Sequence, residues 1–524
     1  TPATTPSVPA TPTTPATAAW PPSATFANPA IWEDLADGDV IRVGDAYYYL
    51  SSNMHYSPGA PILRSYDLVH WEFAGHAIPR LDFSPAYDLT GGRAYIKGTW
   101  ASFLNYRQSE KKFYWGGCIE FGKSYIFTAD SVEGPWQRKA TINNCYYDAG
   151  MLVDDDDTMY VSYGSSTINV AQLSKDGTSQ VRTQKVYEAP PSVGYIEGSR
   201  FYKVNGNYYI FVTRPADTEY VLRSTTGPFG PYTMQPTPFA KGLTSPIPGG
   251  GAPHQGGIVQ TAKGDWYYMA FVDAYPGGRV PVLAPMTWGA DGWPHLQQAN
   301  NAWGTSYPFP DIARPAKDVK PLTGSDTFGG TALGPEWEWN HNPDDTKWTL
   351  GNGLTLGTAT VTDDLYSARN TLTHRTLGPS STATISLDFS RMKDGDRAGL
   401  AMLRDSSAWI GLKRDGTTTR LSMVNNITMD KNWNTASKGT EAAGVPVSGN
   451  RIWLRVTADV RPGPGRQATF SYSTDGTHFT PLGAPFVMGT NWEFFEAQRF
   501  AIFNYATKGL GGSVKVDRFD LTTP

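Results

Sequence analysis

The sequence predicts an all-β fold, in which a five-bladed β-propeller is followed by a β-sandwich. A strand pattern rich in aromatic residues recurs five times in the first part of the chain, and alternating strands without this repeat fill the second part. Aromatic residues make up 13% of the chain, a share that all-β cores favour. A chain of 524 residues is also too long for one compact core, so two domains are expected.

Residues 1–27 are predicted to form a disordered tail ahead of the folded domains. They are almost entirely Thr, Pro, Ala and Ser, a composition that cannot bury a core and that resembles an O-glycosylated stalk. The chain begins with Thr and shows no apolar signal core, which indicates a processed mature form. Together with the N-glycosylation sequon at Asn426, these features predict a secreted, extracellular protein. Whether the two cysteines, Cys118 and Cys145, form a disulfide is left open by the sequence.

Charge and hydropathy exclude several classes of partner. The net charge is −4, with no basic stretch able to follow a phosphate backbone, so nucleic acid is not expected as a partner. No run of about eighteen apolar residues occurs, so no membrane span is expected. The sequence has no phosphate-binding loop, nucleotide fingerprint or zinc-ligand spacing, so no organic cofactor is expected. We expect a monomer that acts on a neutral substrate.

The repeat places five blades within residues 28–320. In each copy a turn of Gly, Asn, Asp or Lys leads into a β-rich strand centred on aromatic residues. The reference tyrosines, separated by 66, 46, 49 and 58 residues, are Tyr48, Tyr114, Tyr160, Tyr209 and Tyr267. Units of about 45–65 residues are typical of four-stranded blades, so each tyrosine is expected on the second strand of its blade. An irregular sandwich with coincidental tyrosine pairs is the less favoured alternative.

Because the innermost strand of each blade lines the central channel, channel residues are expected at a fixed distance before each tyrosine. Asp37, Asp148 and Glu197 lie 11, 12 and 12 residues before the tyrosines of the first, third and fourth copies. The same window holds Trp100 to Ser102 in the second copy and His254 with Gln255 in the fifth. The spacing therefore predicts that three carboxylates meet on one axis.

Three converging carboxylates suit the cleavage of a glycosidic bond. One group protonates the departing oxygen, while another activates water across the sugar ring. Crowded acids repel one another, which raises at least one pKa and keeps a proton available near neutral pH. On spacing alone, Asp34 and Asp39 compete with Asp37 for the channel position. The acidic run 154–157 is a candidate calcium site, although a hairpin turn explains it better.

In this order, the motifs of the first domain resemble glycoside hydrolase family 43, whose members are five-bladed propeller enzymes acting on arabinose- and xylose-containing polysaccharides. The segments that carry the resemblance are 36–45, 58–71, 98–102, 147–150, 196–199, 253–257 and 278–280. The resemblance implies that Asp37 is the catalytic base, that Glu197 is the general acid, and that Asp148 orients Glu197 and modulates its pKa. Gly38 stands where the family often has Pro, a departure that does not move the carboxylate.

The resemblance also implies a set of sugar-contacting residues, which are Trp100, Tyr147, Arg279 and Met54. It places His254 beside a bound ion or water, so a structural calcium at the propeller centre is a further expectation. From the residues alone, Trp100 and Tyr147 suit core packing as well as sugar contact, and Arg279 suits a structural salt bridge. His254 by itself is more typical of a hydrogen-bonded core histidine.

Residues 321–524 are predicted to form a linker and a β-sandwich domain. Alternating strands such as 383–389 and 452–456 indicate this architecture, and the linker is expected over 317–325. The segments 337–343 and 368–373 resemble the concanavalin-like domain attached to many family 43 xylosidases and arabinofuranosidases. The resemblance implies that the sandwich walls one side of the substrate cleft.

The chain resembles most closely the fungal α-L-arabinofuranosidases of this family, which remove arabinose side chains from arabinoxylan. We therefore expect a secreted glycoside hydrolase that acts by single displacement with inversion, including on doubly substituted xylose. A β-xylosidase or another xylan-backbone exo-enzyme is the nearest alternative, because the same carboxylates and domain pair would serve it. A non-catalytic carbohydrate-binding propeller is the alternative from another class, although binding alone rarely needs three converging acids.

Overall fold

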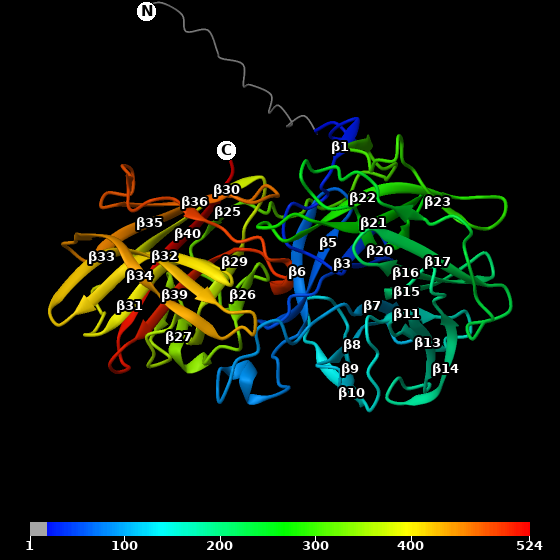
Figure 1. The fold of residues 1–524 in the computed structure, drawn as a ribbon, viewed down its shortest axis with the longest axis horizontal. Coiled ribbons are helices and arrows are strands. Elements are labelled where there is room, and N and C mark those ends of the chain that lie inside the picture. The colour runs from blue at the N-terminus through cyan, green and yellow to red at the C-terminus, as the bar shows by residue number, and fades with distance from the viewer. Residues whose placement is uncertain (1–17) are drawn as a thin grey trace, which may run out of the picture.

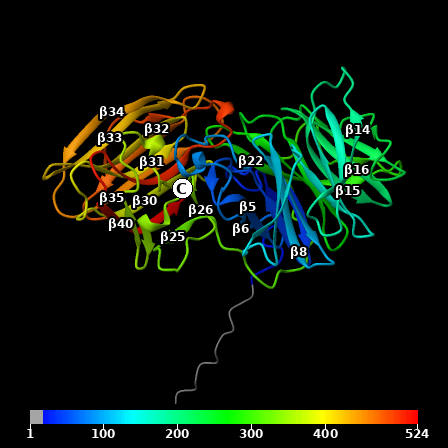
Figure 2. The ribbon, with the colours of Figure 1, turned by 90° about the horizontal axis from the view of Figure 1, so that it is seen from below.

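A computed structural model describes residues 18–524 as two all-β domains that lie side by side, a propeller and a sandwich (Figures 1 and 2). Apart from strands, the described elements are short 3-10 helices: η1 (Pro85–Asp88), η2 (Asp345–Lys347), η3 (Leu365–Ser367) and η4 (Trp492–Phe494). None of the helices in residues 18–524 is long and apolar enough to cross a membrane. The predicted fold class is confirmed.

The propeller consists of five antiparallel sheets, which are the five predicted blades. The first two blades are β2 (Asp39–Val43), β3 (Ala46–Leu50), β5 (Gly59–Ser65) and β6 (Trp71–Ile78), then β7 (Phe103–Arg107), β8 (Lys112–Ile119), β9 (Lys123–Ala129) and β10 (Gln137–Ile142). The third is β11 (Gly150–Val153), β12 (Met159–Tyr163), β13 (Thr167–Leu173) and β14 (Gln180–Glu188). The fourth is β15 (Glu197–Val204), β16 (Asn207–Arg214), β17 (Thr218–Ser224), β18 (Thr233–Met234) and β19 (Ala240–Lys241). The fifth is β20 (His254–Gln260), β21 (Trp266–Asp273), β22 (Arg279–Trp288) and β23 (Pro294–Leu296).

The blades are arranged so that their first strands surround the axis. Each of β2, β7, β11, β15 and β20 contacts the next one, and β20 contacts β2, which closes the ring. The five reference tyrosines all lie on the second strand of their blades, β3, β8, β12, β16 and β21, as predicted. Alternation then buries aromatic side chains between blades; Tyr49, for example, is 1% exposed and lies in one core cluster with Tyr267 of the fifth blade.

The predicted limit of the N-terminal tail at residue 27 is wrong within the described residues. β1 (Thr25–Ala27) pairs with β24 (Ser306–Pro308), the strand that follows the fifth blade. Trp20 packs against Phe309, and its indole N–H donates to the Ile312 carbonyl at 2.8 Å. The Thr/Pro/Ala-rich composition hid the two aromatic anchors, Trp20 and the buried Phe26. The rest of the predicted tail, 1–17, lies outside the described residues.

The sandwich has two large antiparallel sheets that enclose a core of aliphatic and aromatic residues. One sheet contains β27 (Trp348–Leu350), β28 (Leu354–Gly357), β40 (Ser513–Thr522), β30 (Ser380–Asp388), β35 (Arg451–Asp459), β36 (Gln467–Ser473) and β37 (Thr480–Pro481), with β25 (Gly324–Asp326) and β38 (Phe486–Val487) beside them. The other contains β34 (Thr435–Pro446), β33 (Thr418–Met429), β32 (Ser406–Asp415), β31 (Asp396–Leu403), β39 (Arg499–Ala506), β29 (Leu372–Arg375), β26 (Trp337–Asn340) and β4 (Tyr56–Ser57).

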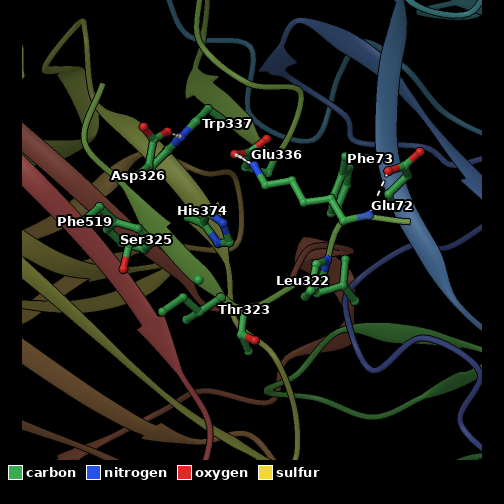
Figure 3. A pocket seen from close by; sticks show the side chains of 14 residues that line it. Glu72, Phe73, Leu322, Thr323, Ser325, Asp326, Glu336, Trp337, His374 and Phe519 are labelled. Carbon is green, nitrogen blue, oxygen red and sulfur yellow. Dashed lines mark hydrogen bonds and ion pairs between the residues drawn. The ribbon is translucent and has the colours of Figure 1, made fainter. Parts of the chain in front are cut away.

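The two domains share a strand and a fixed linker. β4 belongs to the propeller segment of the chain, yet it pairs with β26 and so completes a sheet of the sandwich. In the linker, the backbone N–H of Lys320 donates to Glu72 of the propeller at 2.9 Å, and its ammonium contacts Glu336 of the sandwich at 3.2 Å (Figure 3). These contacts connect the linker to both domains.

Two features that the sequence left open are settled in blades two and three. Cys118 at the end of β8 forms a disulfide with Cys145, which lies ahead of β11, so the bond joins two adjacent blades. The acidic run 154–157 is the turn between β11 and β12, closed by a hydrogen bond from the Asp157 N–H to the Asp154 carbonyl. Its carboxylates pair with Lys203 and Arg107, in agreement with a hairpin turn.

Candidate active site

A cavity of about 700 Å³ opens at one end of the propeller channel, and the sandwich forms part of its wall. Asp37, Asp148 and Glu197 all line it, because each lies just before or at the first residue of an innermost strand. Asp37 and Asp148 have left-handed backbone conformations, with φ of 57° and 48°. Such conformations are costly for residues other than glycine and cluster at functional sites. The structure therefore brings together the three carboxylates that the spacing selected.

Asp37 is held by four hydrogen bonds from three side chains. Arg279 donates to Oδ1 at 3.3 Å and to Oδ2 at 3.2 Å, and Gln255 donates to Oδ1 at 3.0 Å. The Ser52 hydroxyl donates to Oδ2 at 2.7 Å. The residue is 7% exposed, so these donors replace water and fix the direction of the carboxylate.

Glu197, at the start of β15, has a different set of neighbours. The phenol groups of Tyr147 and Tyr195 donate to its Oε2 at 2.8 Å and 2.9 Å. Burial raises the pKa of Glu197, and the charge of Asp37 raises it further, while the two phenol hydrogen bonds and Arg279 lower it. The net result is a raised pKa, which suits a group that must carry a proton.

Asp148 is influenced by the charges of both other carboxylates. It accepts a hydrogen bond from the Gly198 N–H at 3.0 Å, and its carbonyl accepts from the backbone and side chain of Ser199. Burial raises the pKa of Asp148 well above its ordinary value, and the charges of Glu197 and Asp37 act in the same direction. Asp148 therefore contacts the backbone beside Glu197, and the charge of Glu197 influences its protonation.

Asp34 and Asp39, the alternatives to Asp37, do not line this cavity. Asp34 accepts hydrogen bonds from the backbone N–H groups of Arg279 and Ala497, so it lies at the contact between the domains. Asp39 accepts from the Leu104 N–H and lies 3.7 Å from the Arg200 guanidinium. It lines a separate cavity at the other end of the channel. Only Asp37 of the three reaches the cavity that holds Asp148 and Glu197.

The four residues expected to contact sugar, Trp100, Tyr147, Arg279 and Met54, all line the cavity. Trp100 is fixed by its indole N–H, which donates to the Ile96 carbonyl at 2.8 Å, and its ring meets that of Tyr147 edge-on. The guanidinium of Arg279 lies over the rings of Phe271 and Phe495 as well as beside Asp37. Their placement agrees with the expectation, while sugar contact itself stays a prediction.

His254 lines the same cavity but does not resemble a calcium ligand. Its Nδ1 lies 3.1 Å from the Thr213 hydroxyl, and its Nε2 is buried without a hydrogen-bond partner in the described part of the chain. Burial lowers its pKa to about 4, so the ring is neutral. Calcium takes six to eight oxygen ligands, and residues 18–524 contain no group of three or more His, Cys, Asp or Glu side chains able to hold a metal. The expected central calcium stays a prediction, and no chemistry is assigned to it.

Several residues in or beside the cavity were not predicted from the sequence. Gln255 lay in the predicted window, but nothing in the sequence indicated that it donates to Asp37. Tyr195 lies two residues before Glu197, a spacing that could have suggested it. Trp492 and Phe495 come from the sandwich, on and just after η4. Because nearly 300 residues separate them from Glu197 in the sequence, only the docked domains reveal them.

Family models match both domains of the chain. Residues 26–294 match glycosyl hydrolases family 43, and residues 325–522 match the beta xylosidase C-terminal concanavalin A-like domain. Residues 295–324, which include most of the linker described above, lie between the two matches.

Individual proteins match over the same length. The chain is 28% identical to a beta-xylosidase of Formosa agariphila, over 94% of this chain and 90% of that one. It is 29% identical to the non-reducing end alpha-L-arabinofuranosidase BoGH43B of Bacteroides ovatus, over 87% and 86% of the two chains.

A solved structure is more similar still. It is that of a family 43 glycoside hydrolase whose engineered active site displays both endo-xylanase and exo-arabinofuranosidase activity. The two share 50% sequence identity with a TM-score of 0.92, over 95% of this chain and all of the other. Both domains, their order and the cavity with its three carboxylates lead to the same conclusion: the chain belongs to glycoside hydrolase family 43.

Proposed function

We propose that this glycoside hydrolase releases α-L-arabinofuranosyl side chains from arabinoxylan, including from doubly substituted xylose, with inversion at the anomeric carbon. The observation that carries the proposal is the contrast between two carboxylates of one cavity. Asp37 accepts hydrogen bonds from a guanidinium, an amide and a hydroxyl, while Glu197 has a raised pKa. One group is thus equipped to accept a proton and the other to supply one.

The reaction that follows from this pair is a single displacement. Asp37 takes a proton from a water molecule, whose oxygen attacks the anomeric carbon of the arabinosyl residue. Glu197 gives its proton to the glycosidic oxygen as the bond from that oxygen to the anomeric carbon breaks. Asp148 holds the backbone beside Glu197 through the Gly198 N–H, and repulsion between the two carboxylates disfavours the ionisation of both at once. Arg279 orients Asp37 throughout.

The substrate class rests on the relatives. The names of similar proteins refer to xylosidases, arabinofuranosidases and a xylanase, all of which act on components of plant xylan or arabinoxylan. The half-identical structure, with its exo-arabinofuranosidase activity, favours arabinose as the released sugar. A β-xylosidase is the second candidate, favoured by the name of the Formosa relative and by that of the C-terminal domain family.

Chromatography of the sugars released from wheat arabinoxylan tests the proposal, with Glu197→Ala in parallel. Free arabinose from the wild type alone would support the debranching activity and the acid role of Glu197. Xylose or short xylo-oligomers would move the assignment to a xylan-backbone enzyme. Binding of the polymer without release of any sugar would revive the carbohydrate-binding propeller. Proton NMR of the first product anomer tests inversion separately, and net retention would contradict the single displacement.

We also propose that the protein acts outside the cell as a monomer. The disulfide between Cys118 and Cys145 supports an oxidising compartment, where such bonds persist. Sizing by light scattering and localisation of the tagged protein test the two parts of this proposal. A stable dimer or retention in the cytosol would overturn the respective part.

A further inference from the structure

The hairpin between β8 and β9 has an unusual turn. Glu120 and Phe121, at its tip, both have left-handed backbones, with φ of 52° and 57°. The turn is closed by a hydrogen bond from the Gly122 N–H to the Ile119 carbonyl at 3.0 Å. Turns of this kind strongly prefer Asn, Asp or Gly at both positions, so a large aromatic residue there is unfavourable for local structure. The turn therefore holds Phe121 in a place that local folding preferences do not explain.

Contacts on both sides keep this turn in position. The Glu120 carboxylate accepts a hydrogen bond from the Tyr87 hydroxyl at 3.0 Å and lies 3.5 Å from the Lys97 ammonium. Two residues before the turn, Cys118 is bonded to Cys145. Since Cys145 lies two residues before Tyr147, the disulfide fixes the hairpin against the segment that carries Tyr147.

The side chain of Phe121 is directed over the mouth of the catalytic cavity. It is 68% exposed and yet lines that cavity. Its ring is nearly parallel to that of Tyr147, with centroids 5.8 Å apart and planes inclined by 20°. The ring of Trp100 meets it edge-on at 4.9 Å. An exposed ring supported by two others presents a flat apolar surface to solvent at little further entropic cost.

The position of Tyr147 shows on which side of the reaction this surface lies. Its hydroxyl donates to Glu197, the proposed proton donor to the glycosidic oxygen. The leaving group must lie beside that donor, because the proton goes to the oxygen that departs with it. Phe121, stacked on Tyr147, therefore borders the leaving-group side of the cavity.

We propose that Phe121 is a specificity-determining residue, whose ring stacks against a pyranose ring of the polysaccharide backbone on the leaving-group side. This inference rests on the proposed function of the same site. The carbon–hydrogen face of a xylopyranosyl residue is flat and carries no charge, so it suits an exposed phenyl ring. The released arabinose would bind deeper, among the carboxylates.

Competitive inhibition separates the two sides of the cavity. Inhibition constants are measured for xylotetraose, which carries no arabinose, and for L-arabinose, with wild type, Phe121→Ala and Phe121→Tyr. We expect Phe121→Ala to raise the constant for xylotetraose about 3- to 10-fold, the range of one aromatic contact, and to leave that for arabinose unchanged. Phe121→Tyr should restore xylotetraose binding. Val181→Ala, which removes apolar surface that is 61% exposed on β14, is the matched control and should change neither constant.

An equal rise for both inhibitors, or no change for xylotetraose, would overturn the role of Phe121. Failure of the proposed function gives a different result, because the wild type would then cleave xylotetraose or release no arabinose from the polymer. If xylotetraose is cleaved, the same comparison is made on kcat/KM for xylotetraose and for β-D-xylopyranosyl fluoride, whose leaving group is not a sugar, and Phe121→Ala should lower only the value for xylotetraose. The two outcomes are thus read from different measurements.

Discussion

At the scale of single residues, two carboxylates with opposite tasks share one cavity, and their neighbours distinguish them. Asp37 accepts hydrogen bonds from Arg279 and Gln255, whereas Glu197 accepts only from phenols. A phenol stabilises a carboxylate less than a guanidinium does, so burial prevails at Glu197 and its pKa is raised. The hydrogen bonds that each carboxylate accepts, rather than the carboxylates themselves, therefore distinguish the base from the acid.

Removal of one phenol should change the pH profile in a direction that the structure specifies. The Tyr147 hydroxyl donates to Glu197 and favours its ionised form, which lowers the pKa of this acid. Tyr147→Phe removes that effect, so the pKa of Glu197 should rise. Because activity is lost as pH rises through the pKa of the acid, the basic limb of kcat/KM should move to higher pH.

The measurement is kcat/KM for arabinoxylan between pH 4 and 10. Tyr195→Phe should move the basic limb in the same direction, because Tyr195 donates to the same oxygen. Tyr208→Phe is the matched control, since its hydroxyl donates to Asp154 at the other end of the channel, and it should leave the profile unchanged. A basic limb that moves to lower pH in Tyr147→Phe would contradict the role given to this bond.

Spacing from the aromatic repeat predicted which carboxylates meet, and it did so because a propeller brings equivalent positions of its blades to one axis. Asp37 and Glu197 could be found in this way. Spacing could not predict that Gln255 and Ser52 donate to Asp37, because a hydrogen bond depends on side-chain direction. Phe121 was missed for a related reason. Its position over the cavity depends on a left-handed backbone conformation, which a phenylalanine in the sequence does not predict.

At the scale of the element, the first strand of the fifth blade has a bulge that aims Gln255 at the base. The pairing of β20 with β21 shifts between His254 and Gly257, and Gln255 has a φ of 54°. Buried Glu219 of β17 lies beside this bulge. Burial raises its pKa to about 8, against hydrogen bonds from the Tyr268 hydroxyl and from the backbone amides of Gln255 and Gly256. A β-bulge re-aims side chains in this manner.

Gly256 should be indispensable to this bulge. A Cβ atom there would lie 1.8 Å from the Met269 carbonyl oxygen on β21, a contact between backbones that only separation of the strands can relieve. Gly256→Ala should lower the free energy of unfolding by about 1–3 kcal/mol and reduce kcat, since Gln255 would move away from Asp37. Thermal unfolding and steady-state kinetics measure the two effects.

Gly227→Ala is the control for this experiment, because a Cβ atom there meets nothing within 4 Å. It should leave both the unfolding temperature and kcat close to wild type. Wild-type kcat in Gly256→Ala would show that the bulge does not position Gln255.

The blades themselves were predictable from the sequence, because each begins its second strand with a turn and a buried aromatic residue. The borders of the propeller domain could not be predicted in this way. β4 reads as part of the first blade, but it pairs with β26 of the sandwich, a contact between residues nearly 300 positions apart. Likewise, β1 was concealed in a Thr/Pro-rich segment, and its partner β24 follows the last blade.

At the scale of the whole molecule, the two domains form a continuous structure around the active site. Trp492 and Phe495 of the sandwich line the catalytic cavity, and Phe495 lies against Arg279, which orients Asp37. The contact between the domains is polar as well as apolar: Glu338 of the sandwich lies 2.7 Å from the ring of His76 in the propeller, and Arg375 of the sandwich donates to the Asp34 carbonyl. We therefore expect catalysis to depend on how this contact positions Trp492 and Phe495.

Glu33 makes that contact sensitive to pH. Its side chain is fully buried, and neither oxygen has a hydrogen-bond partner among residues 18–524. Burial raises its pKa from 4.5 to about 8, although Arg375 and Arg499 act in the opposite direction. In the unfolded chain Glu33 titrates at its ordinary value, so its contribution to stability is complete below about pH 4.5 and is lost as pH rises to about 8.

Glu33→Gln should remove this dependence, because glutamine keeps the shape of the neutral acid and cannot ionise. Each pH unit between 4.5 and 8 costs the wild type on the order of 1 kcal/mol at this group, so the variant should gain stability relative to wild type as pH rises. Calorimetric unfolding at pH 5 and pH 8 measures the difference, which should favour the variant by several kcal/mol more at pH 8. Glu188→Gln, at a side chain that is 66% exposed, is the control and should show no such trend. A difference between Glu33→Gln and wild type that is equal at the two pH values would mean that Glu33 is ionised in the folded protein, held by the two arginines of the domain contact.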